Sequence, residues 1–415
     1  MATPIISRDT VFVAGGQPSI TYIERSKLEM ERHLARAIAA PNQIVSLSGS
    51  TKCGKTVLCR RVLGDKTYVW VEGGQIHSSG EIWDRICYEL NLPHEVRKSG
   101  ISKTGGTLGG EFYVSVSGSH LRISETAKTY RINSMATALR SLTENADILV
   151  VDDFHYLEDA IRRAFLRNIK GAVFNGLRVM LLSVTHRAFD AIKAESELTG
   201  RFAAITVPEW SDDDLRKIAE KGFVALNISC PAAVIDRLVA ESQQSPFLMQ
   251  KFCWEICYDI GVDSKPVATV RVPTDFDLKS LFVRIAKDSG QPIYDRLVAG
   301  PQSRKQRLRR PLTEGGDADV YEVTLRAIAE SGPKAALSYD EIRTQLGQLL
   351  TGDIPQKHEV TAALKHLSKI SGTIGTEKGL DWDEDKRELN IVDPYLRFFL
   401  RWQIRKGGGT PSLLA

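Results

Sequence analysis

The sequence predicts an α/β protein in which helices cover both faces of a parallel sheet. Three observations lead to this fold class. Short apolar runs alternate with helical patterns through the first half of the chain, a glycine-containing loop joins the first run to a helix, and the strand signal disappears after Ser211. Because crossover helices between parallel strands bury both faces of a sheet, we expect a three-layer core.

Length and composition narrow the function classes. The chain has 415 residues, of which 42% are hydrophobic and 26% charged, and this length suggests two or three domains. It contains no run of about 18 apolar residues, and residues 1–9 lack the apolar core of a signal peptide. We therefore expect a cytoplasmic protein without a membrane partner. The net charge of +4 permits nucleic-acid contact without arguing for it.

Six cysteines form no CxxC pair and have no histidine at zinc-ligand spacing. Cys253 and Cys257 lie one helical turn apart among apolar residues, so we expect them to pack in a core. The sequence therefore predicts neither a disulfide framework nor a structural zinc site.

Residues 49–56 form a complete phosphate-binding loop after the apolar run 42–48 and before a helix. Glycines let its backbone curl around an anion, the Lys55 ammonium suits the β- and γ-phosphates, and the Thr56 hydroxyl suits Mg²⁺. The core is thus expected to be that of a P-loop NTPase with ATP and Mg²⁺ as cofactors. The candidate phosphate-binding residues are Gly49, Ser50, Thr51, Lys52, Cys53, Gly54, Lys55, Thr56 and Val57.

An apolar run that ends in Asp152 and Asp153 predicts the second half of this chemistry. A carboxylate at a strand end can hold hydrated Mg²⁺, and the following acid can orient the attacking water. Asp152 and Asp153 fit these two places, although a strand that ends at the surface would also expose two acids. The distance in sequence from Thr56 leaves room for an additional strand between the motifs.

Two further residues are candidates for sensing the γ-phosphate, and a third for offsetting charge at it in the transition state. Ser183 and Thr185 end the next predicted strand, and the sequence does not choose between them or exclude an N-cap role. Arg201 ends a helix. Its guanidinium could reach a nucleotide held by an adjacent subunit, or it could lie there simply because the helix dipole favours a positive charge at that end.

The predicted order of parts gives the domain organisation. Residues 1–208 form the ATPase core, with a Gly/Ser-rich insertion at about 97–129 that carries a hairpin over 112–123. Residues 209–300 form a helical lid, 301–317 a basic linker, and 318–405 a domain of three helices and a strand pair.

Together, Tyr22-Ile23-Glu24-Arg25, the phosphate loop, Asp152-Asp153, the polar strand end and Arg201 resemble an AAA+/STAND-type ATPase. Residues 244–250 resemble the lid segment of the archaeal-ATPase group and its origin-recognition relatives. Residues 389–402 resemble the end of that group's winged-helix domain. The resemblance covers about residues 15–400.

The resemblance implies a P-loop core, a helical lid, a C-terminal winged helix and Mg-ATP hydrolysis coupled to a switch or to assembly. It also implies that Ile23 and Arg25 lie near the adenine. Two residues depart from the family pattern and argue against rapid hydrolysis. Asp153 stands where many members carry Glu, and Phe247 stands where replication-initiator relatives carry a sensor arginine. We therefore expect an ATPase with slow turnover.

In the winged helix, the second helix, at about 356–370, would enter a DNA groove, with the wing at 371–389 and a turn at 378–379. Acidic residues in this wing oppose DNA, and such domains also serve as protein-interaction or autoinhibitory modules. The leading hypothesis is a switch ATPase that assembles as a homo-oligomer and acts on an effector protein or on DNA. The alternative is an ATP-regulated DNA-binding accessory of replication, recombination or transcription. A defence ATPase that gates a toxic effector is a third option.

Overall fold

A computed structural model describes residues 6–92, 95–98, 128–131, 133–145, 148–184, 200–302, 306–332, 334–373 and 379–404. The chain divides into two compact units. The sheet unit comprises Glu29–Gly49 and Leu58–Val207, and the helical unit comprises Met1–Leu28, Ser50–Val57 and Pro208–Ala415. Within the described ranges, no helix combines the length and apolar character that a membrane crossing requires.

The sheet unit is built on a five-stranded parallel sheet with the order β2-β5-β6-β1-β7. Register places Ser48 of β1 opposite Ser183 of β6 on one side and Thr206 of β7 on the other. All five residues of β1 are buried, as expected for a central strand covered on both faces. The strands are β1 (Ile44–Ser48), β2 (Tyr68–Glu72), β5 (Ile148–Asp152), β6 (Arg178–Ser183) and β7 (Phe202–Thr206).

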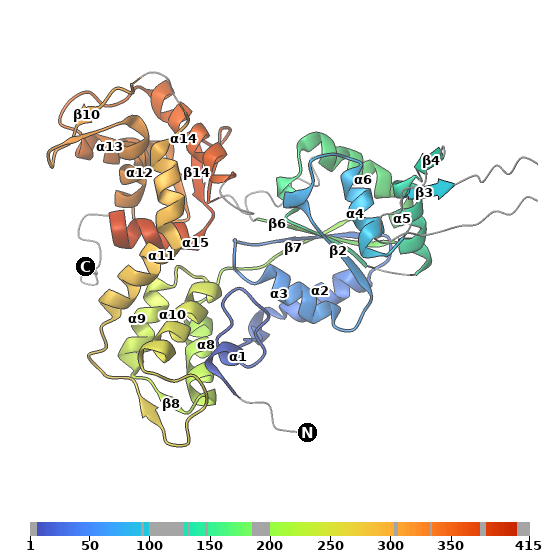
Figure 1. Cartoon of the computed structure of the whole chain (residues 1–415), viewed down its shortest axis with the longest axis horizontal. Coiled ribbons are helices and arrows are strands. Elements are labelled where there is room, and N and C mark those ends of the chain that lie inside the picture. Colours follow the sequence, from blue (N-terminus) through green and yellow to red (C-terminus); the bar gives the residue numbers. More distant parts are fainter. Residues whose placement is uncertain are drawn as a thin grey trace, which may run out of the picture. The chain divides into compact units, whose positions relative to one another are not determined.

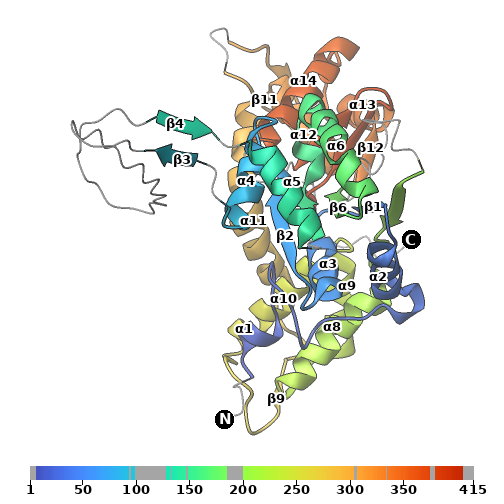
Figure 2. The ribbon, with the colours of Figure 1, turned by 90° about the vertical axis from the view of Figure 1, so that its right-hand side faces the viewer.

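Helices cover the two faces of this sheet (Figure 1, Figure 2). On one face lie α4 (Glu81–Glu89), α5 (Ser134–Glu144) and α6 (Asp159–Phe174), and on the other lie α2 (Met30–Ala39) and α3 (Lys55–Leu63). On the first face the rings of Trp83 and Phe165 stack at 5.6 Å within an apolar cluster. The three-layer α/β core expected from the sequence is therefore confirmed.

Some local expectations differ from the structure. The apolar pattern over residues 26–39 predicts one continuous helix, but Glu29, whose φ of 46° is left-handed, interrupts it, and a 3₁₀ turn (Ser26–Leu28) precedes α2. In the insertion, β3 (Glu95–Lys98) pairs antiparallel with β4 (Lys128–Arg131). The hairpin expected over 112–123 and the helix expected after β6 lie outside the described residues.

The helical unit contains nine helices among its described residues, beginning with the short α1 (Arg8–Val11). Serines cap two of these helices: Ser211 accepts from the Asp214 backbone, and Ser338 forms a capping box with Glu341. The other helices are α8 (Asp212–Ala225), α9 (Ala232–Glu241), α10 (Pro246–Asp259), α11 (Leu278–Ala299), α12 (Val320–Glu330), α13 (Tyr339–Leu349), α14 (Lys357–Ser371) and α15 (Pro394–Phe399).

Short strands accompany these helices. A three-stranded antiparallel sheet has the order β12-β14-β13, with β12 (Ala336–Ser338), β13 (Leu380–Asp383) and β14 (Glu388–Ile391). The turn between β13 and β14 therefore falls at residues 384–387, not at 378–379 as the sequence suggested. Two-residue ladders join β8 (Ile228–Ser229) to β9 (Val270–Arg271) and β10 (Arg310–Pro311) to β11 (Asp317–Ala318).

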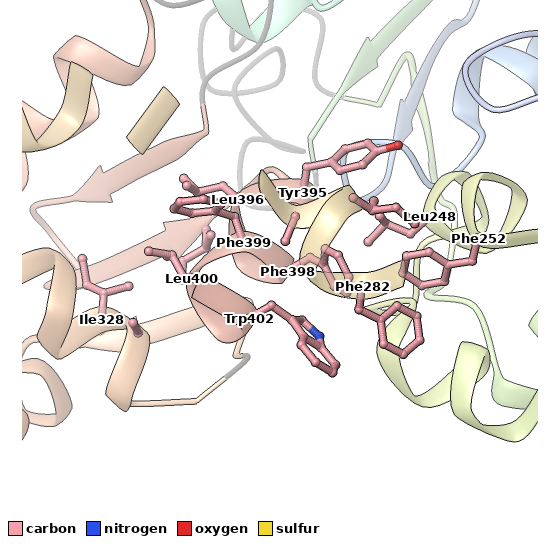
Figure 3. Packing of buried hydrophobic residues seen from close by; sticks show 14 of the residues in the cluster. Leu248, Phe252, Phe282, Ile328, Tyr395, Leu396, Phe398, Phe399, Leu400 and Trp402 are labelled. Atoms are coloured by element: carbon pink, nitrogen blue, oxygen red, sulfur yellow. The ribbon is translucent and has the colours of Figure 1, made fainter. Parts of the chain in front are cut away.

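A single apolar core runs through the helical unit (Figure 3). The α15 segment, residues 394–404, comprises α15 and the helical turn that follows it. One face of this segment presents Tyr395, Phe398 and Trp402 to α10 and α11, while the other face carries leucines toward α12. This spacing of three and four residues is that of a helix buried on two sides. The segment thus joins the helices of residues 211–300 to those of 318–371.

Candidate functional site

The ends of three neighbouring strands bring candidate residues to one edge of the sheet. β1 ends at Ser48, β5 at Asp152 and β6 at Ser183, and parallel strands place their carboxyl ends together. The backbone N–H of Gly49 donates to the Ser183 carbonyl oxygen at 3.2 Å, so the phosphate loop leaves from this edge. Because β6 lies between β1 and β5, the acidic pair stands about 10 Å from the end of β1.

The phosphate loop itself has a tight, left-handed curl. Lys52 has a φ of 59° and Gly54 a φ of 97°, a conformation that glycine adopts without strain. Lys55 opens helix α3, is only 8% exposed, and its Nζ donates to the Ser50 carbonyl oxygen at 2.9 Å. The N-terminus of α3 therefore follows directly on a loop whose shape suits an anion.

Residues far from the loop in sequence hold it within the helical unit. Trp210 Nε1 donates to the Cys53 carbonyl oxygen at 2.8 Å, and Lys52 Nζ donates to Asp393 Oδ1 at 2.9 Å. Neither Trp210 nor Asp393 stood out in the sequence. Trp210 lies just before the capping serine of α8, and no local pattern marks it as a loop contact.

The two residues expected near the adenine, Ile23 and Arg25, are both buried in the helical unit. Arg25 Nη1 donates to the Pro208 carbonyl oxygen at 2.8 Å, and its guanidinium lies 4.8 Å from the centre of the Trp210 ring. Arg25 is therefore linked through Trp210 to the phosphate loop. Contact with a base remains a prediction.

The acidic pair has a constrained backbone. Asp153 is left-handed, with φ 52° and ψ 37°, and its N–H donates to Asp152 Oδ1 at 2.9 Å. Gly73, which follows β2, packs against it, and a Cβ there would lie 2.7 Å from the Asp153 carbonyl oxygen. Uncommon backbone conformations of this kind gather at functional sites. The Gly-Gly pair after β2 was the missed sequence signal.

Electrostatics place the Asp152 carboxylate near helix α3. Burial, and then the charge of Asp152, raise the pKa of the Cys59 thiol to about 12. Cys59 belongs to α3 and its Sγ lies 3.8 Å from Met180 Sδ, in the sheet unit. This thiol is therefore an unreactive packing group of the sheet unit.

Of the two sensor candidates, only Ser183 is described. Its side chain is 5% exposed, and its Oγ has no hydrogen-bond partner among the described residues. A buried hydroxyl without a partner is uncommon, and here it lies at the carboxyl end of β6, in register with Ser48 of β1. Thr185 lies outside the described residues, so the structure does not decide between the two.

Arg201 lies at the amino ends of the strands, opposite the carboxyl ends that carry Asp152 and Ser183. Its carbonyl oxygen accepts from the Ile44 N–H at 2.7 Å, at the start of β1, and its guanidinium lies 5.4 Å from the Phe174 ring centre. A five-residue strand spans about 16 Å. Arg201 is thus not brought together with Asp152 in the same chain, and the role predicted for it requires a second subunit.

Comparisons with known proteins add distant likenesses. The family model described as "Bacterial TniB protein" matches residues 115–212, a segment that contains Asp152, Asp153 and Arg201. A search of the curated proteins gives no match.

Among the solved structures, three are similar to this chain along most of its length. The Orc1 protein of Aeropyrum pernix in complex with DNA is 12% identical, with a TM-score of 0.48, over 97% of this chain and 98% of that chain. Cdc6p from Pyrobaculum aerophilum is 13% identical, with a TM-score of 0.43, over 97% and 100%. The RuvB Holliday junction branch migration motor of Thermotoga maritima is 14% identical, with a TM-score of 0.40, over 89% and 93%. These likenesses are too distant to bring an activity or a partner to this chain.

Proposed function

We propose that the protein is an ATP-binding switch of the AAA+/STAND type that hydrolyses ATP slowly and couples its nucleotide state to assembly and to a partner. The observation that carries this proposal is the curled phosphate loop with Lys55 at the head of α3. Asp152 and Ser183 at the carboxyl edge of the sheet supply the polar groups that phosphoryl transfer needs beside such a loop.

Magnesium fits the residues present. Thr56 and Asp152 offer the oxygen ligands that a small hard cation prefers. The part of the chain that the structure describes has no group of three or more His, Cys, Asp or Glu side chains arranged for a metal, so phosphate oxygens and water would complete the coordination. When bound, Mg²⁺ would offset phosphate charge. Asp153 would orient the attacking water, and its short side chain supports slow turnover.

Assembly is the part of the proposal that concerns Arg201. Its place at the amino edge of the sheet directs it away from the Asp152 of its own chain. In a homo-oligomer it would offset transition-state charge at the neighbour's nucleotide. Sizing the protein with ADP and with a non-hydrolysable ATP analogue tests this. A size that never changes, together with normal turnover by Arg201→Ala, would rule out the role.

The nucleotide site is tested by three variants. Lys55→Ala should lose roughly 100-fold in affinity for a fluorescent ATP analogue, because a charge-assisted phosphate contact disappears. Asp153→Asn should bind the analogue but not turn ATP over. Lys66→Ala, an exposed lysine between α3 and β2, is the matched control and should behave as wild type. Wild-type affinity in Lys55→Ala would refute the assignment.

DNA binding is the second candidate function, and one surface favours it. Helix α14 presents an open groove of about 590 Å³ lined by Gln356, Lys357, His358, Thr361, Ala362 and Lys365. We propose that α12–α14 with strands β12–β14 form a winged helix with α14 as its recognition helix. Against this, Lys365 is paired with Glu384 of the β13–β14 turn. A protein-interaction role is therefore its direct rival.

The fluorescence anisotropy of labelled duplex DNA, measured with and without ATP, distinguishes DNA recognition by α14 from a role in protein interaction. Binding at low salt that weakens in Lys357→Ala would support DNA recognition, because each lost phosphate contact lowers the salt slope by about one. An absence of binding in both nucleotide states would leave α14 as a protein-docking surface. A role in prokaryotic defence, with an effector encoded nearby, would be decided by the gene neighbourhood.

A further inference from the structure

The side chain of Lys52, in the middle of the phosphate loop, is held in an aromatic and acidic box. Its Nζ donates to Asp393 Oδ1 at 2.9 Å and lies 5.1 Å from the Tyr395 ring centre and 5.8 Å from that of Phe247. The two charged side chains are 21% and 11% exposed. One carboxylate and two rings thus surround the ammonium group, an arrangement that favours a cation more than an exposed ion pair does.

The walls of the box are fixed by local structure. Asp393 is the N-cap of α15, and its Oδ1 also accepts from the Tyr395 N–H at 2.8 Å, which orients the carboxylate. The Phe247 and Tyr395 rings meet edge to face, with centres 5.3 Å apart. A Cβ on Gly15 would lie 2.9 Å from the Phe247 ring, so a glycine is needed where that ring packs. The residues around the Lys52 ammonium are therefore held by contacts of their own.

Helix α15 cannot shift without disturbing the core of the helical unit. Leu396, Phe398 and Phe399 are fully buried, and Trp402 Nε1 donates to Glu241 Oε2 at 2.9 Å (Figure 3). Packed interiors transmit displacement because they contain few voids. The position of the loop at Lys52 is thus tied to the packing of the C-terminal segment.

We propose that Asp393 is a positioning residue for the nucleotide site: through Lys52 it holds the phosphate loop in its binding shape, so that nucleotide binding and the docking of α15 stabilise each other. This inference rests on the proposed function of the loop. A loop held in its bound shape has less ordering to do on binding, and this raises affinity. Linkage requires the reverse effect, namely that nucleotide strengthens the docking of α15 by the same factor.

The first test is a double-mutant cycle on affinity for a fluorescent ADP analogue. Asp393→Asn keeps an N-cap side chain but removes the charge, so the helix start should survive. It and Lys52→Gln should each weaken binding about five- to tenfold, and the double variant should be no weaker than either alone. Lys334→Gln, which breaks an exposed ion pair with Glu341 in the same unit, is the matched control and should leave affinity unchanged.

The second test reads the reverse coupling, which a merely structural contact would not show. Hydrogen exchange of residues 393–404 should slow when ADP is added to the wild-type protein, and it should respond less in Asp393→Asn. The inference is overturned if wild type binds ADP while both single variants bind it within twofold and ADP leaves this segment unchanged. Failure of wild type to bind nucleotide would instead refute the proposed function, and the inference with it.

Discussion

Phe398 lies in the shared core of the helical unit, so its truncation should lower the stability of several helices at once. Its ring is fully buried, with ring centres at 5.2 Å from Phe252 of α10, 5.9 Å from Phe282 of α11 and 6.2 Å from Trp402. Truncation of a buried phenylalanine to alanine costs about 3–5 kcal/mol. The loss of three ring–ring contacts places Phe398→Ala in the upper part of that range.

Hydrogen exchange followed by mass spectrometry is the suitable assay, because a two-unit chain need not unfold in one step. A loss of about 4 kcal/mol corresponds to exchange roughly 1,000-fold faster for amides that exchange through a rapid opening equilibrium. Amides of α10, α11 and α15 should accelerate together in Phe398→Ala, while those of α6 in the sheet unit should not. Val224→Ala, at a position on α8 that is 74% exposed, is the control and should change stability by less than about 0.5 kcal/mol. If only residues 393–404 accelerate and α10 keeps its protection, the idea of one shared core is wrong.

Three other expectations follow from single contacts. Gly222→Ala places a Cβ 2.1 Å from the Phe12 ring, so overpacking should lower the free energy of unfolding by about 1–3 kcal/mol, measurable as a lower Tm. The Lys334 ammonium, and then the Ser338 backbone and hydroxyl, lower the pKa of Glu341 to about 2. Since this pKa lies below its unfolded value near 4.5, its stabilising effect is present above pH 4.5 and is lost as pH falls toward 2. Glu341→Gln should therefore flatten that part of the Tm–pH curve. The Cys59 thiol, with its pKa raised to about 12 by burial, should resist alkylation at pH 8 until the protein unfolds.

Each of these expectations has a control or a contrary outcome. Gly171, in α6, has no atom within 4 Å of an added Cβ, so Gly171→Ala should not destabilise. A Tm–pH curve of unchanged shape in Glu341→Gln would show that its carboxylate does not stabilise the fold. Labelling of native Cys59 at the rate of a free thiol would show that α3 opens readily.

Local pattern was enough to predict much of the fold. Buried apolar runs predicted β1, β5 and β6, because a strand covered on both faces needs uninterrupted apolar residues. The order of the strands could not be predicted from local pattern, because it depends on pairing between residues that are far apart in the chain, such as Ser48 and Ser183. The turn after β13 was misplaced because its residues, 384–387, include no glycine, whereas residues 378–379 do.

The candidate site was predictable only where its residues are neighbours in sequence. The phosphate loop and the acidic pair are contiguous motifs, and each lies at the strand end where it was expected. Trp210 and Asp393 were missed because nothing in a capping aspartate or a lone tryptophan indicates a partner hundreds of residues away. Arg201 was placed correctly before a strand, but only the register shows at which edge of the sheet it lies.

The shared core has a consequence for how the chain is made. Val11 and Phe12 belong to the same apolar cluster as Phe398 and Trp402, at the two extremes of the described residues. At a synthesis rate of about 5–20 residues per second, the first of these waits roughly 20–80 seconds for the last to emerge. The strands of the sheet unit are complete by residue 206, so that unit can fold on the ribosome while the apolar faces of α10 and α11 are still uncovered. We expect nascent or prematurely ended chains to depend on chaperones over this interval.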